Sequence, residues 1–118
     1  MHELGIAASI LERVQKESAQ RNGARAIKVG VRIGELSGVD PEALSFGFEA
    51  LVKDTPLEGL ALEIDYRKRM QRCSRCSREY ESSMLFTVCP ECGSLETACI
   101  AGDELDLMFI ELEDPACV

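Results

Sequence analysis

The chain has 118 residues, of which 46% are hydrophobic, and its formal net charge at pH 7 is −8. This length fits one compact domain with one small insert, and the apolar content suffices for a hydrophobic core. The acidic balance argues against nucleic acid as the main partner, because binding nucleic acid relies on clustered Lys and Arg. No apolar run approaches the roughly 20 residues of a membrane span, and no basic and apolar leader opens the chain. We therefore expect a cytoplasmic protein.

The sequence opens with Met1-His2-Glu3, and His2 is the only histidine in the chain. A terminal amine, the backbone nitrogen that follows it and the imidazole can bind one metal ion in fused chelate rings. Such rings lie flat, and a tetragonal set of nitrogen donors suits Ni(II) or Cu(II) better than tetrahedral Zn(II). The start of the chain therefore predicts a nickel site that includes His2.

Two segments have the apolar spacing and the end signals of helices. The first covers about residues 4–21 and ends at Asn22-Gly23. The second begins at Asp40-Pro41, where Asp caps the helix and Pro suits its first position, and it ends before Thr55-Pro56. The apolar residues expected on the inner faces are Leu4, Ala7, Ala8, Leu11 and Val14 in the first helix and Leu44, Phe48, Leu51 and Val52 in the second.

Three segments have the composition of strands. Apolar and other residues alternate along residues 27–33 and 60–66, which is the period of half-buried strands. Residues 105–112 form the third strand, but its apolar residues occupy both parities, so the pattern does not show which face is buried. The alternating apolar residues are Ile27, Val29, Val31 and Ile33 in the first strand and Leu60, Leu62, Ile64 and Tyr66 in the second.

Four of the six cysteines form two CxxC pairs, Cys73 with Cys76 and Cys89 with Cys92, separated by twelve residues. Two such pairs facing each other supply the closed tetrahedral shell of structural zinc. Six cysteines in a chain without a leader point to a reducing compartment, where thiols bind metal more often than they form disulfides. A redox dithiol is the alternative, but it usually uses one pair and leaves the second unexplained. We assign no role to the remaining Cys99 and Cys117.

The expected fold class is α+β, with a small three-stranded sheet, two helices and a four-cysteine zinc-ribbon module inserted before the last strand. Residues 1–68 together with 103–118 form the expected nickel-binding α/β domain, and residues 69–102 form the zinc-binding module. The module holds too few large apolar residues to offset a backbone entropy of about 1 to 2 kcal/mol per residue, so zinc must supply folding energy. We expect its two connections to form a neck and to favour antiparallel pairing of the second and third strands.

A basic run without acidic residues follows the second strand and reaches into the first cysteine pair. Such a run beside a zinc ribbon is typical of nucleic-acid surfaces, which makes a nucleic-acid-binding or regulatory adaptor protein the alternative function. The acidic remainder and the lack of interleaved aromatic residues favour instead a solvated face or a docking patch for an acidic protein. The residues of the run are Arg67, Lys68, Arg69, Arg72, Arg75 and Arg78.

Several motifs together resemble the HypA/HybF hydrogenase maturation factors. They are Met1-His2-Glu3 with the amphipathic helix after it, the segment Arg-Ile-Gly-Glu-Leu-Ser at residues 32–37, and CxxC followed after twelve residues by CPxCG. The resemblance spans nearly the whole chain. It implies a nickel metallochaperone that helps to insert Ni(II) into the large subunit of nickel-iron hydrogenase, together with the GTPase HypB, and that assists urease in some organisms.

The resemblance also implies roles for individual residues. His2 matches the nickel ligand, and Met1 and Glu3 flank it as candidates for further backbone donors. The residues that match the structural zinc ligands are Cys73, Cys76, Cys89 and Cys92. Ni(II) is then a transient cargo, the partners are a HypB-type GTPase and the hydrogenase large subunit or its maturation complex, and a homodimer stays open. An enzyme is not expected, because the chain has no second histidine, no GxGxxG fingerprint and no phosphate-binding GKS or GKT loop.

Overall fold

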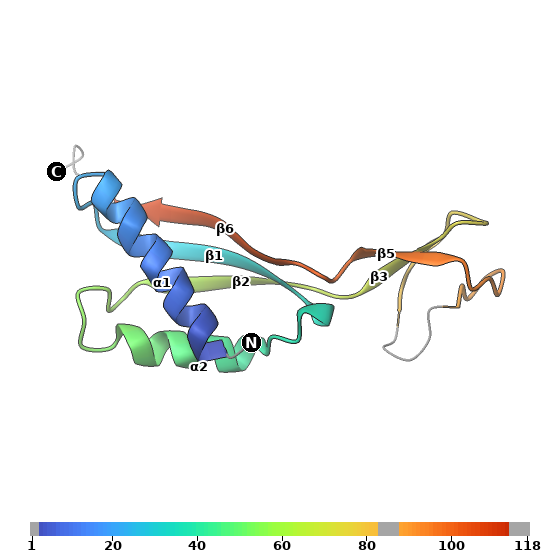
Figure 1. Cartoon of the computed structure of the whole chain (residues 1–118), viewed down its shortest axis with the longest axis horizontal. Coiled ribbons are helices and arrows are strands. Elements are labelled where there is room, and N and C mark those ends of the chain that lie inside the picture. The colour runs from blue at the N-terminus through green and yellow to red at the C-terminus, as the bar shows by residue number, and fades with distance from the viewer. Residues whose placement is uncertain (1–2, 83–87, 114–118) are drawn as a thin grey trace.

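A computed structural model describes residues 3–82 and 88–113, so that Met1, His2 and Cys117 lie outside the described residues. Within this part of the chain two helices and a short 3-10 helix accompany two separate sheets (Figure 1). No described helix is both long and apolar enough to cross a membrane. The elements are α1 (Glu3–Gln20), β1 (Ala26–Gly34), η1 (Glu35–Ser37), α2 (Pro41–Val52), β2 (Ala61–Arg67), β3 (Met70–Cys73), β4 (Glu79–Glu81), β5 (Thr97–Ala101) and β6 (Leu105–Leu112).

The first sheet has the strand order β2-β1-β6, with β2 parallel and β6 antiparallel to the central strand β1. The expected fold class is confirmed, but the expected pairing of the second strand with the third is wrong because β1 lies between them. The connection through α2 returns the chain parallel to β1, and the long excursion after β2 brings it back on the opposite edge. Within the excursion, β3 and β5 pair antiparallel, and together with β4 they form the second sheet.

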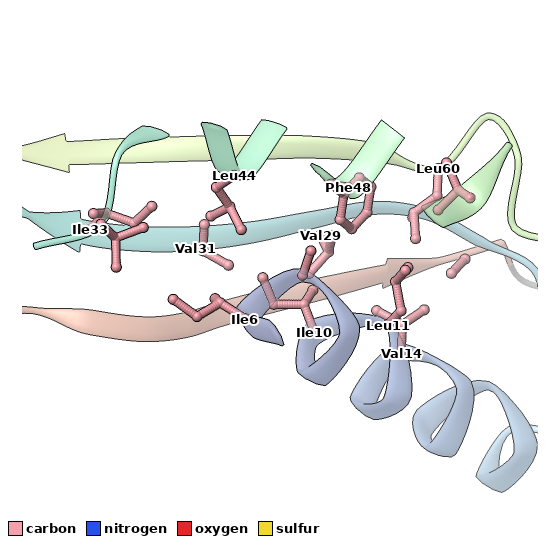
Figure 2. Close-up of a cluster of buried hydrophobic side chains, with 14 residues drawn as sticks. Ile6, Ile10, Leu11, Val14, Val29, Val31, Ile33, Leu44, Phe48 and Leu60 are labelled. Carbon is pink, nitrogen blue, oxygen red and sulfur yellow. The ribbon is translucent and has the colours of Figure 1, made fainter. Parts of the chain in front are cut away.

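The hydrophobic core lies between the first sheet and the two helices, which cover the same face of that sheet (Figure 2). In α2 the expected residues are found in the core, with Leu51 only partly buried. In α1 the buried stripe includes Ile6 and Ile10, whereas Leu4 and Ala8 are exposed, contrary to expectation. Two adjacent stripes of this helix are apolar, and the periodicity does not show which one faces the sheet. The core residues that α1 contributes are Ile6, Ala7, Ile10, Leu11 and Val14.

An irregularity in the pairing of β1 with β6 explains the apolar residues at both parities of the last strand. Gly30 lies opposite Phe109, and the next residue of β1, Val31, lies opposite Leu107. Met108 is therefore an extra residue of β6 that has no partner in β1, as in a β-bulge. An extra residue of this kind reverses the alternation of side chains beyond it. Leu107 therefore lies toward the helices, as Ile110 does, although the two are three residues apart. Phe109 covers Gly30 on the opposite face of the sheet.

The first two strands are buried largely as expected, with two exceptions. Ile27 is exposed and Ala26 is buried in its place, because the register with β6 shifts between Ala26 and Lys28. Tyr66 is exposed at the end of β2. The remaining residues are buried or pack against the core, namely Val29, Val31, Ile33, Leu60, Leu62 and Ile64.

The two chain segments that join the sheets meet η1 in a tight joint. The Leu36 N–H donates to the Gly102 carbonyl oxygen at 2.7 Å, and the Arg69 N–H donates to Glu35 Oε1 at 3.0 Å. Gly34 lies so close to Gly102 that no side chain fits between them. These contacts tie the entry to the second sheet to the end of β1. The division into domains at residues 68/69 and 102/103 stays a prediction.

We expect Gly34→Ala to destabilise the protein. A Cβ atom at Gly34 would lie 2.1 Å from the Gly102 carbonyl oxygen, and backbone atoms cannot rotate aside as a side chain can. Overpacking of this kind lowers the free energy of unfolding by about 1 to 3 kcal/mol, which chemical denaturation measures. Gly5→Ala is the control, because a Cβ atom there meets nothing within 4 Å. Unchanged stability of Gly34→Ala would contradict the packing of this joint.

Candidate metal centre

The four cysteines of the CxxC pairs come together beside the second sheet. Cys73 ends β3, Cys76 follows in the next turn, and Cys89 and Cys92 come from the turn that precedes β5. The Sγ atoms of Cys73 and Cys92 lie 3.5 Å apart and those of Cys76 and Cys89 lie 3.6 Å apart. All four sulfur atoms lie within 4.8 Å of one another. A tetrahedral zinc ion with Zn–S bonds of about 2.3 Å requires sulfur separations of about 3.8 Å, so the cluster fits zinc.

Both CxxC turns have the same backbone hydrogen bond, which gives the two turns the same local shape. The Ser77 N–H donates to the Cys73 carbonyl oxygen, and the Gly93 N–H donates to the Cys89 carbonyl oxygen, each at 2.9 Å. Ser77 and Gly93 have φ values of 64° and 73°, in the left-handed region that reverses a chain tightly. The residue after the second cysteine thus closes each turn, and the local sequence builds both halves of the site.

The thiols of this cluster do not ionise equally. The Cys76 backbone N–H lowers the pKa of Cys73 to about 6, and the Cys92 backbone N–H likewise lowers the pKa of Cys89. The Arg78 backbone N–H favours the Cys76 thiolate, but burial and the three neighbouring sulfur atoms outweigh it and raise the pKa of Cys76 to about 12. Thiolates packed this closely repel one another, so that full ionisation of the set requires a cation.

The arrangement is the one expected of a structural site. Four protein ligands would close a tetrahedral shell and leave no position for a substrate. Cys73 is only 1% exposed, and neither pair stands at the start of a described helix, where redox CxxC pairs are usually found. Cys99 lies outside the cluster, is exposed, and its Sγ donates to the Ala101 carbonyl oxygen at 3.3 Å.

The second candidate metal site, at the N-terminus, is described only from Glu3 onward. Glu3 is the first residue of α1, and its Oε1 accepts a long hydrogen bond of 3.5 Å from the Asp40 N–H. Asp40 caps α2 by accepting from the Glu42 N–H at 3.0 Å. The starts of the two helices are therefore neighbours (Figure 1), and the acidic residues Glu3 and Asp40 meet there. The sequence identified Asp40 only as a helix cap, because no local signal links residues 37 positions apart.

The basic run near the joint is partly neutralised. Arg67 Nε lies 3.3 Å from the Asp65 carboxylate, and Arg78 Nη1 lies 3.2 Å from Glu91 Oε2. Arg72 stands opposite Glu79 in the ladder between β3 and β4. Carboxylates thus accompany three of the six basic residues, which weakens the positive charge that a nucleic acid would meet.

The chain is similar to known proteins over nearly its whole length. Residues 1–112 match the protein family described as "Hydrogenase/urease nickel incorporation, metallochaperone, hypA". The chain is 40% identical over 113 residues to the hydrogenase maturation factor HypA of Geobacter sp., covering 96% of this chain and 100% of that protein. It is 41% identical over 117 residues to the factor of the same name from Solidesulfovibrio magneticus, with the same coverage of both proteins.

The fold is similar to solved structures as well. The solution structure of the Ni metallochaperone HypA from Helicobacter pylori superposes with a TM-score of 0.60 at 26% sequence identity. The match covers 95% of this chain and 97% of that one. A second solution structure of HypA protein has the same fold, with a TM-score of 0.67.

Proposed function

The chain belongs to the HypA family of nickel-incorporation metallochaperones, and on that premise we propose that it carries Ni(II) at its N-terminus for hydrogenase maturation. The resemblance to HypA/HybF factors is confirmed, and proteins of this family are maturation factors and not enzymes. The observation that carries the proposal is the family match, which begins at residue 1 and so includes Met1 and His2.

We assign the nickel donors to the terminal amine of Met1, to the backbone nitrogen and imidazole of His2, and to the backbone nitrogen of Glu3. The start of α1 at Glu3 supports this assignment. The first four N–H groups of a helix have no acceptor within the helix. A metal that replaces these amide protons therefore breaks no helical hydrogen bond. The imidazole and the amide nitrogens complete fused rings of the kind that Ni(II) prefers.

A terminal site suits delivery, because ligands at a chain end exchange with an acceptor more readily than ligands fixed in a core. Copper(II) exceeds nickel in intrinsic affinity for such donors. Selectivity must therefore come from metal supply and from the partners. We propose a HypB-type GTPase for the nucleotide-driven step and the hydrogenase large subunit, or its maturation complex, as acceptor, in the cytoplasm. Urease is the second client that the family description names.

We assign a structural zinc ion to Cys73, Cys76, Cys89 and Cys92. Their sulfur spacing supports this role, as does the small apolar content of residues 69–102, where Val88, Leu95 and Ile100 are exposed. On this assignment residues 69–102 form a zinc module, and residues 1–68 with 103–118 form the nickel-binding domain.

Titration of Ni(II) into zinc-loaded protein with an unmodified first residue tests the proposal. We expect uptake of about one nickel ion per chain at the N-terminus, with the absorption spectrum of a planar nitrogen-rich site. Calorimetry and absorbance measure the stoichiometry and the geometry. Failure of the zinc-loaded chain to take up nickel would contradict the proposal. Salt-sensitive retention on nucleic acid, weakened by Arg72→Glu, would support the alternative function instead.

A further inference from the structure

Phe46 is the most exposed large apolar side chain among the described residues, with 77% of its surface accessible. It stands on α2 two residues before Phe48, which is buried in the core. Because successive helical residues differ by about 100° in direction, Phe46 points away from the sheet that Phe48 contacts. An aromatic ring at this position buries little surface within the fold, so that its apolar surface is open to contact with another molecule.

The surroundings of Phe46 indicate what kind of molecule binds there. Glu42 and Glu49 flank the ring one turn before and one turn after it, and neither carboxylate forms an ion pair with a described residue. Together with Pro41 and Ser45 these residues line a shallow hollow of about 360 Å³. We call these five residues the Phe46 surface. It requires a partner with an apolar pocket for the ring and with Lys or Arg at the edge of that pocket.

The Phe46 surface lies near Glu3, the one residue of the proposed nickel site that the structure describes. Asp40, the cap of α2, contacts Glu3, which follows His2 in the chain. At 1.5 Å per residue, Phe46 lies about 9 Å along the helix from that contact. Leu4, 52% exposed, lies against Gly47, the residue after Phe46, and is a second exposed apolar side chain near the start of α1. A protein bound to Phe46 therefore lies close to Glu3, the first described residue of this chain.

From these observations we infer that the Phe46 surface docks the protein that accepts nickel, and that this partner has an apolar pocket edged with basic residues. The inference rests on the proposed function. A second copy of this chain fits poorly as the partner. In such a dimer the carboxylates of one surface would face those of the other, and each chain has a net charge of −8, so the two copies would repel each other. Nucleic acid is disfavoured by the same charges. A central aromatic residue with a charged rim is the usual composition of a binding hot spot.

The test measures binding of zinc-loaded protein to the purified precursor of the hydrogenase large subunit by calorimetry. We expect Phe46→Ser to weaken binding at least about tenfold, as loss of a hot spot does. Leu95→Ser is the matched control, because Leu95 is 76% exposed but lies in the zinc-binding part of the chain, and it should change the affinity less than about twofold. The double variant Glu42→Lys, Glu49→Lys should weaken binding most at low salt, where charge attraction is strongest.

Phe46→Ser that binds the precursor as tightly as the unchanged protein would overturn the inference, and so would equal losses in Phe46→Ser and Leu95→Ser. Precursor that fails to bind the unchanged protein overturns it too. Nickel uptake separates this inference from the proposed function. Phe46→Ser should still take up nickel at the N-terminus, whereas a chain that binds the precursor through Phe46 but takes up no nickel would contradict the proposed function alone.

Discussion

His2→Ala is expected to abolish nickel uptake at the N-terminus while the four-cysteine cluster keeps its zinc. The imidazole closes the six-membered ring of the proposed chelate, and no other histidine exists in the chain to replace it. The amine and amide nitrogens that remain hold nickel weakly at neutral pH, because the amide proton leaves only when neighbouring donors anchor the metal. Calorimetric titration of nickel and metal analysis of zinc measure the two sites in the same sample.

A second variant separates the role of the amine from that of the imidazole. One residue added before Met1 turns the terminal amine into an amide but leaves His2 unchanged, and we expect it to abolish uptake as well. Nickel affinity should also fall in acid, because an imidazole and a terminal amine with reference pKa values of about 6.5 and 7.7 to 8.0 must both lose protons. Glu12→Gln, an exposed change on α1, is the control and should bind nickel normally. Equal uptake by the unchanged protein and His2→Ala would refute the assignment.

Removal of zinc is expected to unfold residues 69–102 while the first sheet and its two helices stay folded. Structural zinc contributes apparent binding free energies of about 10 to 16 kcal/mol in small modules, which the few apolar contacts there cannot replace. The core of the first sheet draws its residues from α1, α2, β1, β2, β6 and the loops beside α2, and none from the cysteine turns. Hydrogen exchange after chelation should show protection lost in β3, β4 and β5 and retained in β1.

Substitution of a single cysteine tests the same point without a chelator. Cys73→Ser should have the effect of zinc removal, because Cys73 is buried in the cluster. Cys99→Ser is the control, since Cys99 lies outside the cluster, and it should keep one zinc ion and normal protection. Zinc affinity should fall as the pH falls, because the Cys76 thiol, with its pKa raised to about 12, must release its proton to bind. Full protection of β3 in zinc-free protein would show that the module folds without metal.

The sequence by itself determined the features that depend on neighbouring residues. Helical and strand periods placed α1, α2, β1, β2 and β6 within a residue or two of their ends, because each period reflects local backbone geometry. The two CxxC pairs predicted the sulfur cluster, since each pair builds its own turn through Ser77 or Gly93. The Met1-His2 pair predicted a chelating terminus for the same reason, and that site stays a prediction.

Only the tertiary structure decided which elements and faces meet. The central place of β1 depends on contacts between distant segments, and an additional residue at Met108 reverses the faces of β6 without any local sign. The choice of Ile6 over Leu4 for the core followed from how α1 packs beside α2. The same packing brought Glu3 to Asp40 and left Phe46 on the outside. Sequence periods specify what each segment can bury, whereas the match between segments selects which of those faces is buried.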